Sequence, residues 1–217
     1  MTYVRWLAGE VFAVARTNRG WMTWNLILAF IPAVLAVPLL WRPHRRDAGW
    51  WVGMAVLVLF LPNAPYVLTD LIHLRLDAAQ AASDGVLVFG VLPIYGTFIL
   101  LGMAAYLVCL EGMVREARSV RPDLPRWAVE VPVTALCSLG IVLGRIARLN
   151  SWDTITGPVG TLERAFATLT WRGAPAAFLV IFLAVWISAT VLRVLVTAAA
   201  AWVGGLGVVR RLTGSAG

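Results

Sequence analysis

Long runs of apolar residues, separated by short charged stretches, set the pattern of this chain. A helix that spans a bilayer needs about 20 consecutive, mostly apolar residues. Four runs meet this requirement, over residues 21–40, 49–69, 86–110 and 175–195. The first three carry no charged residue, and the fourth carries only Arg193 near its end, where a long cationic side chain can reach the membrane boundary. We predict a transmembrane helix for each run.

A fifth span is predicted over residues 128–144, which are less uniformly apolar. Glu130 lies near the start of this segment, and Arg145 ends it abruptly. Gly140 and Gly144 are four residues apart and share one helix face, a spacing that lets membrane helices approach each other closely. The segment therefore predicts a helix that packs tightly against a neighbour.

The stretch over residues 2–15 is apolar but short, and it contains Arg5 and Glu10. It is compatible with a short sixth span or with an amphipathic helix lying in the membrane surface. The predicted fold class is an all-α, multipass transmembrane helix bundle of five or six spans. We expect residues 1–217 to form a single integral membrane domain.

Composition strengthens the membrane interpretation. Hydrophobic residues make up 60% of the chain and charged residues 13%, whereas soluble domains are about 45–50% apolar and about 25% charged. These values exclude a soluble enzyme, a disordered chain and a disulfide scaffold. Cys109 and Cys137 lie within apolar runs and are expected to act as small buried hydrophobes.

Arginine accounts for all 18 basic residues, and the formal net charge is +7. These arginines lie between the apolar runs, so they predict membrane topology and no nucleic-acid partner. Three fall in residues 41–48 and four in residues 111–127, against one in residues 70–85. This bias places residues 41–48, residues 111–127 and the C-terminus on the inner side of a plasma (inner) membrane. Residues 70–85 then lie on the outer side. Residues 145–174 also fall outside although they carry four arginines, which departs from the rule.

A first polar motif occupies residues 60–74, with the sequence FLPNAPYVLTDLIHL. Its two prolines disfavour a continuous helix and predict a kink or break near the outer end of the second span. Broken backbone is tolerated in hydrocarbon only where protein or a wet cavity surrounds it. The polar candidates are Asn63 at depth, then Tyr66 and Thr69, and then Asp70 and His73 on one helix face. The alternative interpretation is a simple helix terminator beside ordinary interfacial residues.

A second polar motif occupies residues 143–153, with the sequence LGRIARLNSWD. Its two arginines are neighbours on one helix face, and the residues that follow offer capping groups, ligands and an interfacial indole; the candidates are Arg145, Arg148, Asn150, Ser151, Trp152 and Asp153. A basic helix end followed by a turn is the alternative interpretation. Because both motifs end helices that run in the same direction, we expect them to meet at one membrane face.

These motifs, together with the sequence WNLILAFIP over residues 24–32, resemble an uncharacterised bacterial family of multipass membrane proteins, the domain of unknown function 1361. The first polar motif is similar to the family signature PNAPYxxTDxxHL, and the second polar motif to LGRxxRxNSWD. The resemblance implies an integral membrane bundle and supplies no activity.

Two classes of function remain open at this point. In the favoured class, a structural, transport or assembly role, Asp70 pairs with Arg145 and Asp153 with Arg148 to fix neighbouring helices. In the alternative, a membrane enzyme, the catalytic or metal-binding candidates are Asp70, His73 and Asp153. The two polar motifs together contain one histidine and no cysteine, which disfavours zinc. An anionic lipid-linked substrate would then contact the binding candidates Asn63, Tyr66, Thr69, Arg145, Arg148, Asn150, Ser151 and Trp152. The sequence identifies the lipid bilayer as a partner. It identifies no cofactor and no oligomeric state.

Overall fold

A computed structural model describes residues 2–42, 45–146 and 156–213, and every regular element in this part of the chain is helical. In chain order the elements are α1 (Tyr3–Ala36), η1 (Val37–Trp41), α2 (Ala48–Phe60), α3 (Asn63–Tyr66), η2 (Val67–Asp70), α4 (Leu71–Ala79), α5 (Asp84–Val86), η3 (Leu87–Val91), α6 (Leu92–Val120), α7 (Trp127–Ile146), α9 (Pro158–Leu169) and α10 (Ala174–Thr213).

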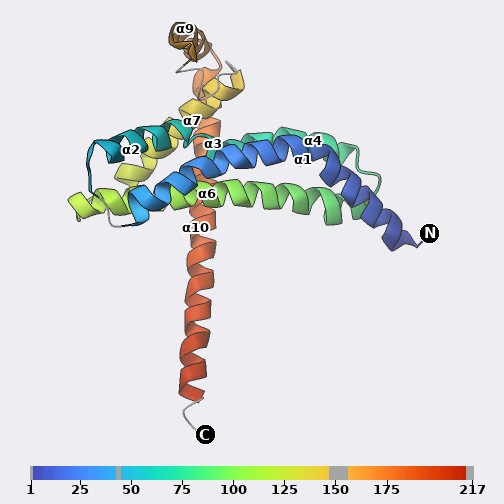
Figure 1. Cartoon of the computed structure of the whole chain (residues 1–217). Helices are drawn as coiled ribbons and strands as arrows, with labels where there is room; N and C mark the ends of the chain where they lie inside the picture. Colours follow the sequence, from blue (N-terminus) through green and yellow to red (C-terminus); the bar gives the residue numbers. More distant parts are fainter. Residues whose placement is uncertain (1, 43–44, 147–155, 214–217) are drawn as a thin grey trace.

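Five helical segments of the described chain are long and apolar enough to cross a membrane: Tyr3–Trp41, Ala48–Ala79, Asp84–Val120, Trp127–Ile146 and Ala174–Val203. The prediction of an all-α, multipass helical bundle is confirmed. The helix formed by α1, the one formed by α6 and the broken line of α2, α3 and α4 run alongside one another, while α10 crosses them (Figure 1). Such a set of apolar helices fits a lipid bilayer.

The helices extend further than the sequence predicts, most of all at the N-terminal side. Residues 2–15 do not form an element of their own, because α1 continues without interruption from Tyr3. The physical reason is that the first proline of α1 is Pro32, so nothing before it removes a backbone donor or breaks the helix. The charges at Arg5 and Glu10, which suggested a boundary, are compatible with an uninterrupted helix.

The second span is broken where its two prolines predict. Helix α2 ends at Phe60, and the chain continues through α3, a 3₁₀ turn (η2) and α4. Asn63 begins α3, and its side-chain amide donates a hydrogen bond of 2.9 Å to the carbonyl of Phe60. This bond satisfies a carbonyl that loses its helical partner at the break.

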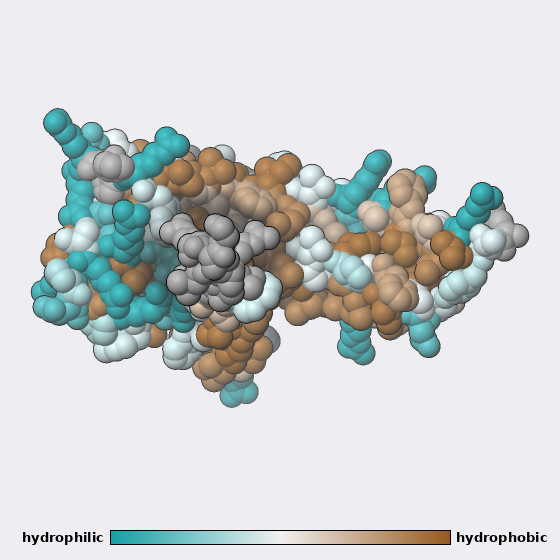
Figure 2. Space-filling model, turned by 90° about the horizontal axis from the view of Figure 1, so that it is seen from below, coloured by the Kyte–Doolittle hydropathy of each residue, from teal (hydrophilic) through white to brown (hydrophobic). Residues whose placement is uncertain are grey.

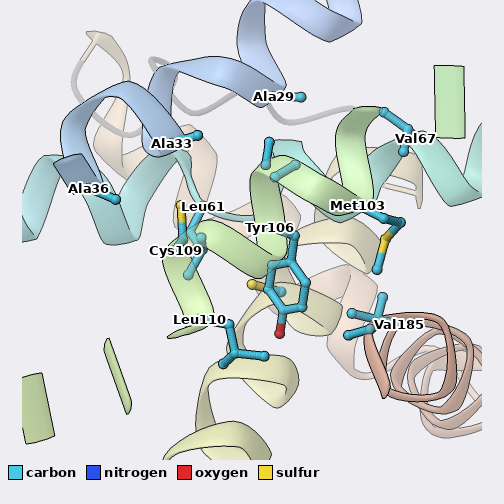
Figure 3. Packing of buried hydrophobic residues seen from close by; sticks show 14 of the residues in the cluster. Ala29, Ala33, Ala36, Leu61, Val67, Met103, Tyr106, Cys109, Leu110 and Val185 are labelled. Carbon is cyan, nitrogen blue, oxygen red and sulfur yellow. The ribbon is translucent and has the colours of Figure 1, made fainter. Parts of the chain in front are cut away.

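The core of the bundle forms where α1 meets the broken span and α6. In Figure 3, Ala29, Ala33 and Ala36 of α1 lie across from Leu61, and Tyr106 of α6 stands near the centre of the cluster. Small residues on α1 allow the helices to approach closely. Cys109 and Cys137 are buried free thiols, as expected of small apolar side chains.

Two glycines hold the broken span between α6 and α7. A Cβ atom on Gly102 of α6 would lie 2.9 Å from the carbonyl oxygen of Ala64, and one on Gly140 of α7 would lie 2.7 Å from Cγ of Pro62. Neither position has room for a larger side chain. The tight packing predicted from the spacing of Gly140 is therefore directed at the break itself.

Charged side chains collect at the ends of the bundle. Figure 2 shows a hydrophilic end where η1 finishes, α2 begins and α6 ends, followed by a broad hydrophobic middle. At the hydrophilic end Arg46 of the loop before α2 forms an ion pair of 2.6 Å with Glu116 of α6. Asp47 caps α2 by accepting a hydrogen bond of 2.9 Å from the backbone amide of Trp50.

Candidate functional site

The candidate site is centred on Asp70, the last residue of η2, which is only 2% exposed. The guanidinium of Arg145, in the last turn of α7, forms an ion pair with one oxygen of this carboxylate. The side-chain amide of Asn25, in α1, donates a hydrogen bond of 2.8 Å to the other oxygen. One buried carboxylate therefore joins three separate stretches of the chain.

Arg145 is held on two further sides. Its Nε–H donates a hydrogen bond of 2.7 Å to the hydroxyl of Thr69, and its guanidinium carbon lies 4.6 Å from the centroid of the Tyr66 ring, within the range of a cation–π interaction. The Arg145 side chain nevertheless stays 30% exposed, against 3% for Asp70. We call Asn25, Tyr66, Thr69, Asp70 and Arg145 the Asp70 site.

The broken backbone determines how the Asp70 site is assembled. The 3₁₀ turn of η2 brings Thr69 back over α3, so that its hydroxyl donates a hydrogen bond of 2.6 Å to the carbonyl of Tyr66. The same hydroxyl accepts the bond from Arg145. Thr69 and Asp70 are three and four residues from Tyr66, so the three lie on one side of the turn, where all of them contact Arg145 of α7.

A second polar cluster lies about two helical turns further along α4, around Asp77. One Asp77 oxygen accepts hydrogen bonds from the amide of Asn18 (2.6 Å) and the hydroxyl of Tyr95 (3.1 Å). The indole N–H of Trp21 donates a bond of 2.9 Å to the Asn18 side-chain oxygen. The His73 ring packs against the Trp21 ring, with a centroid distance of 4.8 Å. We call Asn18, Trp21, Asp77 and Tyr95 the Asp77 cluster.

Comparison with known proteins identifies the family. A family described as a protein of unknown function (DUF1361) matches residues 24–190. The chain belongs to the DUF1361 family. No curated protein and no solved structure matches it. All five residues of the Asp70 site lie within the matched part of this DUF1361 protein, whereas Asn18 and Trp21 of the Asp77 cluster lie outside it.

Some of the predicted site residues of this DUF1361 protein lie together in the structure. The structure brings together Tyr66, Thr69 and Asp70 with Arg145. The Asn63 amide donates a hydrogen bond to the carbonyl of Phe60 at the end of α2, and its place in a binding site stays a prediction. His73 shares a helix face with Asp70 as predicted, but the contact that its ring makes is with Trp21. The other predicted members, Arg148, Asn150, Ser151, Trp152 and Asp153, lie outside the described residues.

A metal site built on Asp70, His73 and Asp153 stays a prediction, because Asp153 lies outside the described residues. Among the residues that the structure does describe, no three His, Cys, Asp or Glu side chains gather as ligands for a metal ion. The chemistry visible at the Asp70 site is that of charge pairing and hydrogen bonding.

Sequence reasoning missed a polar network near the other end of α7. Glu130, 5% exposed, forms ion pairs with Arg126 in the turn before α7 and with Arg193 of α10. Glu111 of α6 pairs with Arg126 and lies 4.0 Å from Arg193. We call these four residues the Glu130 network. The available signal was a pair of opposite charges, Glu130 and Arg193, each within an otherwise apolar run.

The Glu130 network gives Arg193 specific partners. Its guanidinium points to a buried carboxylate in the first turn of α7. Burial by itself would lower the pKa of the Arg126 guanidinium, but hydrogen bonds to Glu111 and Glu130 outweigh burial and raise that pKa. Arg126 therefore remains charged and bound to both carboxylates.

Proposed function

We propose that this protein works in the plasma (inner) membrane without catalysis, in transport or in the assembly of other membrane components. In this proposal the Asp70 site is a lock at the outer membrane face that fixes the broken span against α1 and α7. The observation that carries the proposal is that each oxygen of the buried Asp70 carboxylate already has a protein donor, Arg145 on one and Asn25 on the other.

The position of the lock along the helices supports the outer face. A helix rises about 1.5 Å per residue, so Asn25 lies about 24 Å from Trp41 at the arginine-rich end. By the same measure Arg145 lies about 27 Å from Trp127. The hydrocarbon core of a bilayer is about 30 Å thick. If the arginine-rich loops lie at the inner boundary, the Asp70 site lies close to the outer one.

The packing of Asp70 and His73, the two predicted catalytic side chains that the structure describes, favours a lock over an enzyme. A general base needs a free lone pair within reach of the substrate proton, and the Asp70 carboxylate is buried and engaged on both oxygens. His73 is packed against Trp21 with a distance of 4.8 Å between the ring centroids, so the indole covers one side of its imidazole. An ion pair of this kind fixes the packing of neighbouring elements.

A broken span beside a charged pair is also a feature of transporters, whose discontinuous helices form binding sites. The exposed part of Arg145 supports a finer element of the proposal, contact with the phosphate or carboxylate of an anionic lipid-linked ligand, in which Arg148 would take part. Transport or assembly is therefore the function class that the geometry favours.

The proposal is tested by comparing Asp70→Asn with His73→Phe in the full chain, purified in a neutral detergent. Asp70→Asn leaves Arg145 without its counter-charge, and we expect the melting temperature to fall by about 5–10 °C, the equivalent of about 2–3 kcal/mol in a chain of this size. His73→Phe keeps a ring against Trp21 while removing the imidazole, and we expect a change of less than about 2 °C.

The catalytic alternative makes the opposite prediction for Asp70. Active-site residues are commonly retained at a cost in stability, so neutralising a catalytic carboxylate leaves the melting temperature unchanged or raises it. A melting temperature for Asp70→Asn equal to or above that of the unaltered chain would overturn the lock. Asp123→Asn, in the exposed turn between α6 and α7, is the matched control for the removal of one negative charge.

A further inference from the structure

The side of α1 that faces away from the core forms an apolar groove with α2. The groove has a volume of about 770 Å³, and its walls include Leu26, Ile27, Phe30 and Val34 of α1 and Val56 and Phe60 of α2. Several of these side chains are largely open to the surroundings; Val34 is 67% exposed and Ile27 is 51% exposed. A furrow lined by aliphatic and aromatic side chains at this depth has the shape and chemistry to take a hydrocarbon chain.

Two arginines continue the same helix face beyond the groove. Successive residues of an α-helix are about 100° apart, which puts Arg19 about one turn and Arg16 about two turns before Thr23, the groove residue closest to the N-terminus. Both arginines are exposed. Within the described chain neither has an ion pair or a hydrogen bond from its guanidinium, in contrast to Arg145 and Arg193.

The spacing along α1 places these arginines at the level of lipid headgroups. Counting about 1.5 Å per residue from Trp41, Thr23 lies at about 27 Å, Arg19 at about 33 Å and Arg16 at about 38 Å. The hydrocarbon core is about 30 Å thick, and the bilayer with its headgroup regions about 40–45 Å. When Trp41 lies at the arginine-rich boundary, the groove therefore lies in the core, and both guanidinium groups lie just beyond its opposite edge.

We propose that the α1–α2 groove binds an acyl chain of an anionic phospholipid and that Arg16 and Arg19 hold its phosphate. Charge complementarity selects this occupant: an apolar furrow that ends at two unpaired cations matches a hydrocarbon chain that ends at a phosphate, and guanidinium groups form strong hydrogen bonds to phosphate oxygens. The site does not depend on the lock, because Asn25 projects from the opposite side of α1 toward Asp70.

The test titrates the full chain in neutral detergent with phosphatidylglycerol and with phosphatidylcholine of the same acyl composition, and counts bound lipids by native mass spectrometry. We expect phosphatidylglycerol to bind at least tenfold more tightly than phosphatidylcholine. A basic residue near an anionic headgroup contributes a factor of about five to affinity, so Arg16→Gln with Arg19→Gln should weaken phosphatidylglycerol binding about 25-fold. Phosphatidylcholine binding should hardly change in that variant.

Two further variants separate the groove from general charge. Arg75→Gln removes an exposed cation from α4 and should leave the affinity for phosphatidylglycerol within a factor of two. Val34→Trp partly fills the groove from an exposed position and should weaken the binding of both lipids at least fivefold. The melting temperature without lipid shows that each variant is folded, and the open positions of these side chains make a loss of folding unexpected.

Three results would overturn the proposal. The first is equal affinity for the two lipids, and the second is a loss of affinity in Arg75→Gln as large as in the Arg16 and Arg19 variant. The third is an affinity for inorganic phosphate alone that equals the affinity for phosphatidylglycerol, because the groove would then contribute nothing to binding. None of these results bears on the lock at Asp70, whose test uses no lipid.

Discussion

The Asp70 site and the Glu130 network lie near opposite ends of α7 and are built differently. At the Asp70 site one carboxylate is shared between one guanidinium and a neutral amide. In the Glu130 network the carboxylate of Glu130 is shared between two guanidinium groups, and Glu111 also reaches both of these arginines. The first joins α7 to α1 and to the broken span, and the second joins α7 to α6 and α10.

This difference predicts how each region responds to the loss of its carboxylate. Without Asp70 one guanidinium is left, and that guanidinium is 30% exposed and still bonded to Thr69. Without Glu130 two guanidinium groups, 28% exposed in Arg126 and 21% exposed in Arg193, are left with the single carboxylate of Glu111, which lies 4.0 Å from Arg193. An unpaired charge costs more the less water reaches it. We therefore expect the Glu130 network, which the sequence motifs did not reveal, to contribute more to stability than the Asp70 site, which they did.

The largest effect is expected from Glu130→Gln. Removal of one partner of a buried ion pair costs about 3–5 kcal/mol, and the loss here affects Arg126 and Arg193 together. Unfolding of the purified protein by heat in neutral detergent should show a melting temperature at least 5 °C below that of Asp70→Asn. The comparison between the two regions breaks down if Glu130→Gln is as stable as the control Asp123→Asn.

A smaller effect is expected from Gly102→Ala, which disturbs only the region of the broken span. The new Cβ would lie 2.9 Å from the carbonyl oxygen of Ala64, and a backbone atom cannot yield as a flexible side chain does. Crowding of a packed interior costs about 1–3 kcal/mol. The matched control is Gly96→Ala in the same helix, where a Cβ meets nothing within 4 Å, and we expect this variant to be more stable by up to about 1 kcal/mol.

The pair of glycine variants sharpens the comparison because α6 contributes to both regions. Gly102 touches the broken span, whereas Glu111 lies on the same helix more than two turns away. If Gly102→Ala lowers the melting temperature no more than Gly96→Ala does, α6 does not constrain the broken span, and the close approach seen at Ala64 has little energetic weight.

How much of the fold and of the Asp70 site could be predicted depends on whether the residues that determine each feature lie close together in the sequence. The break in the second span follows from Pro62 and Pro65, which act on their own backbone. The meeting of Asp70 with Arg145 follows from two helices that run in one direction and end in dense polar motifs. The break rests on neighbouring residues, whereas the meeting of Asp70 with Arg145, 75 residues apart, is predictable because each lies in a dense polar motif at the end of its helix.

The remaining partners depend on how distant helices pack, and no local spacing encodes that. Asn25 lies 45 residues before Asp70, and Asn18 lies 59 residues before Asp77; each is one polar residue in a long helix. The continuity of α1 differs, because its signal is local: Arg5 and Glu10 suggest a boundary, but no proline interrupts the helix before Pro32.

A double-mutant cycle between Asp70 and Arg145 tests the central claim most directly. The free energy of unfolding is measured for the unaltered chain, for Asp70→Asn, for Arg145→Gln and for the double variant. Each full chain is unfolded in mixed micelles by titration with a denaturing detergent. The lock predicts that each single change costs about 2–3 kcal/mol and that the double change costs less than their sum, with a coupling of about 1–3 kcal/mol. Additivity within about 0.5 kcal/mol would contradict the claim that these two residues stabilise the broken span as a pair.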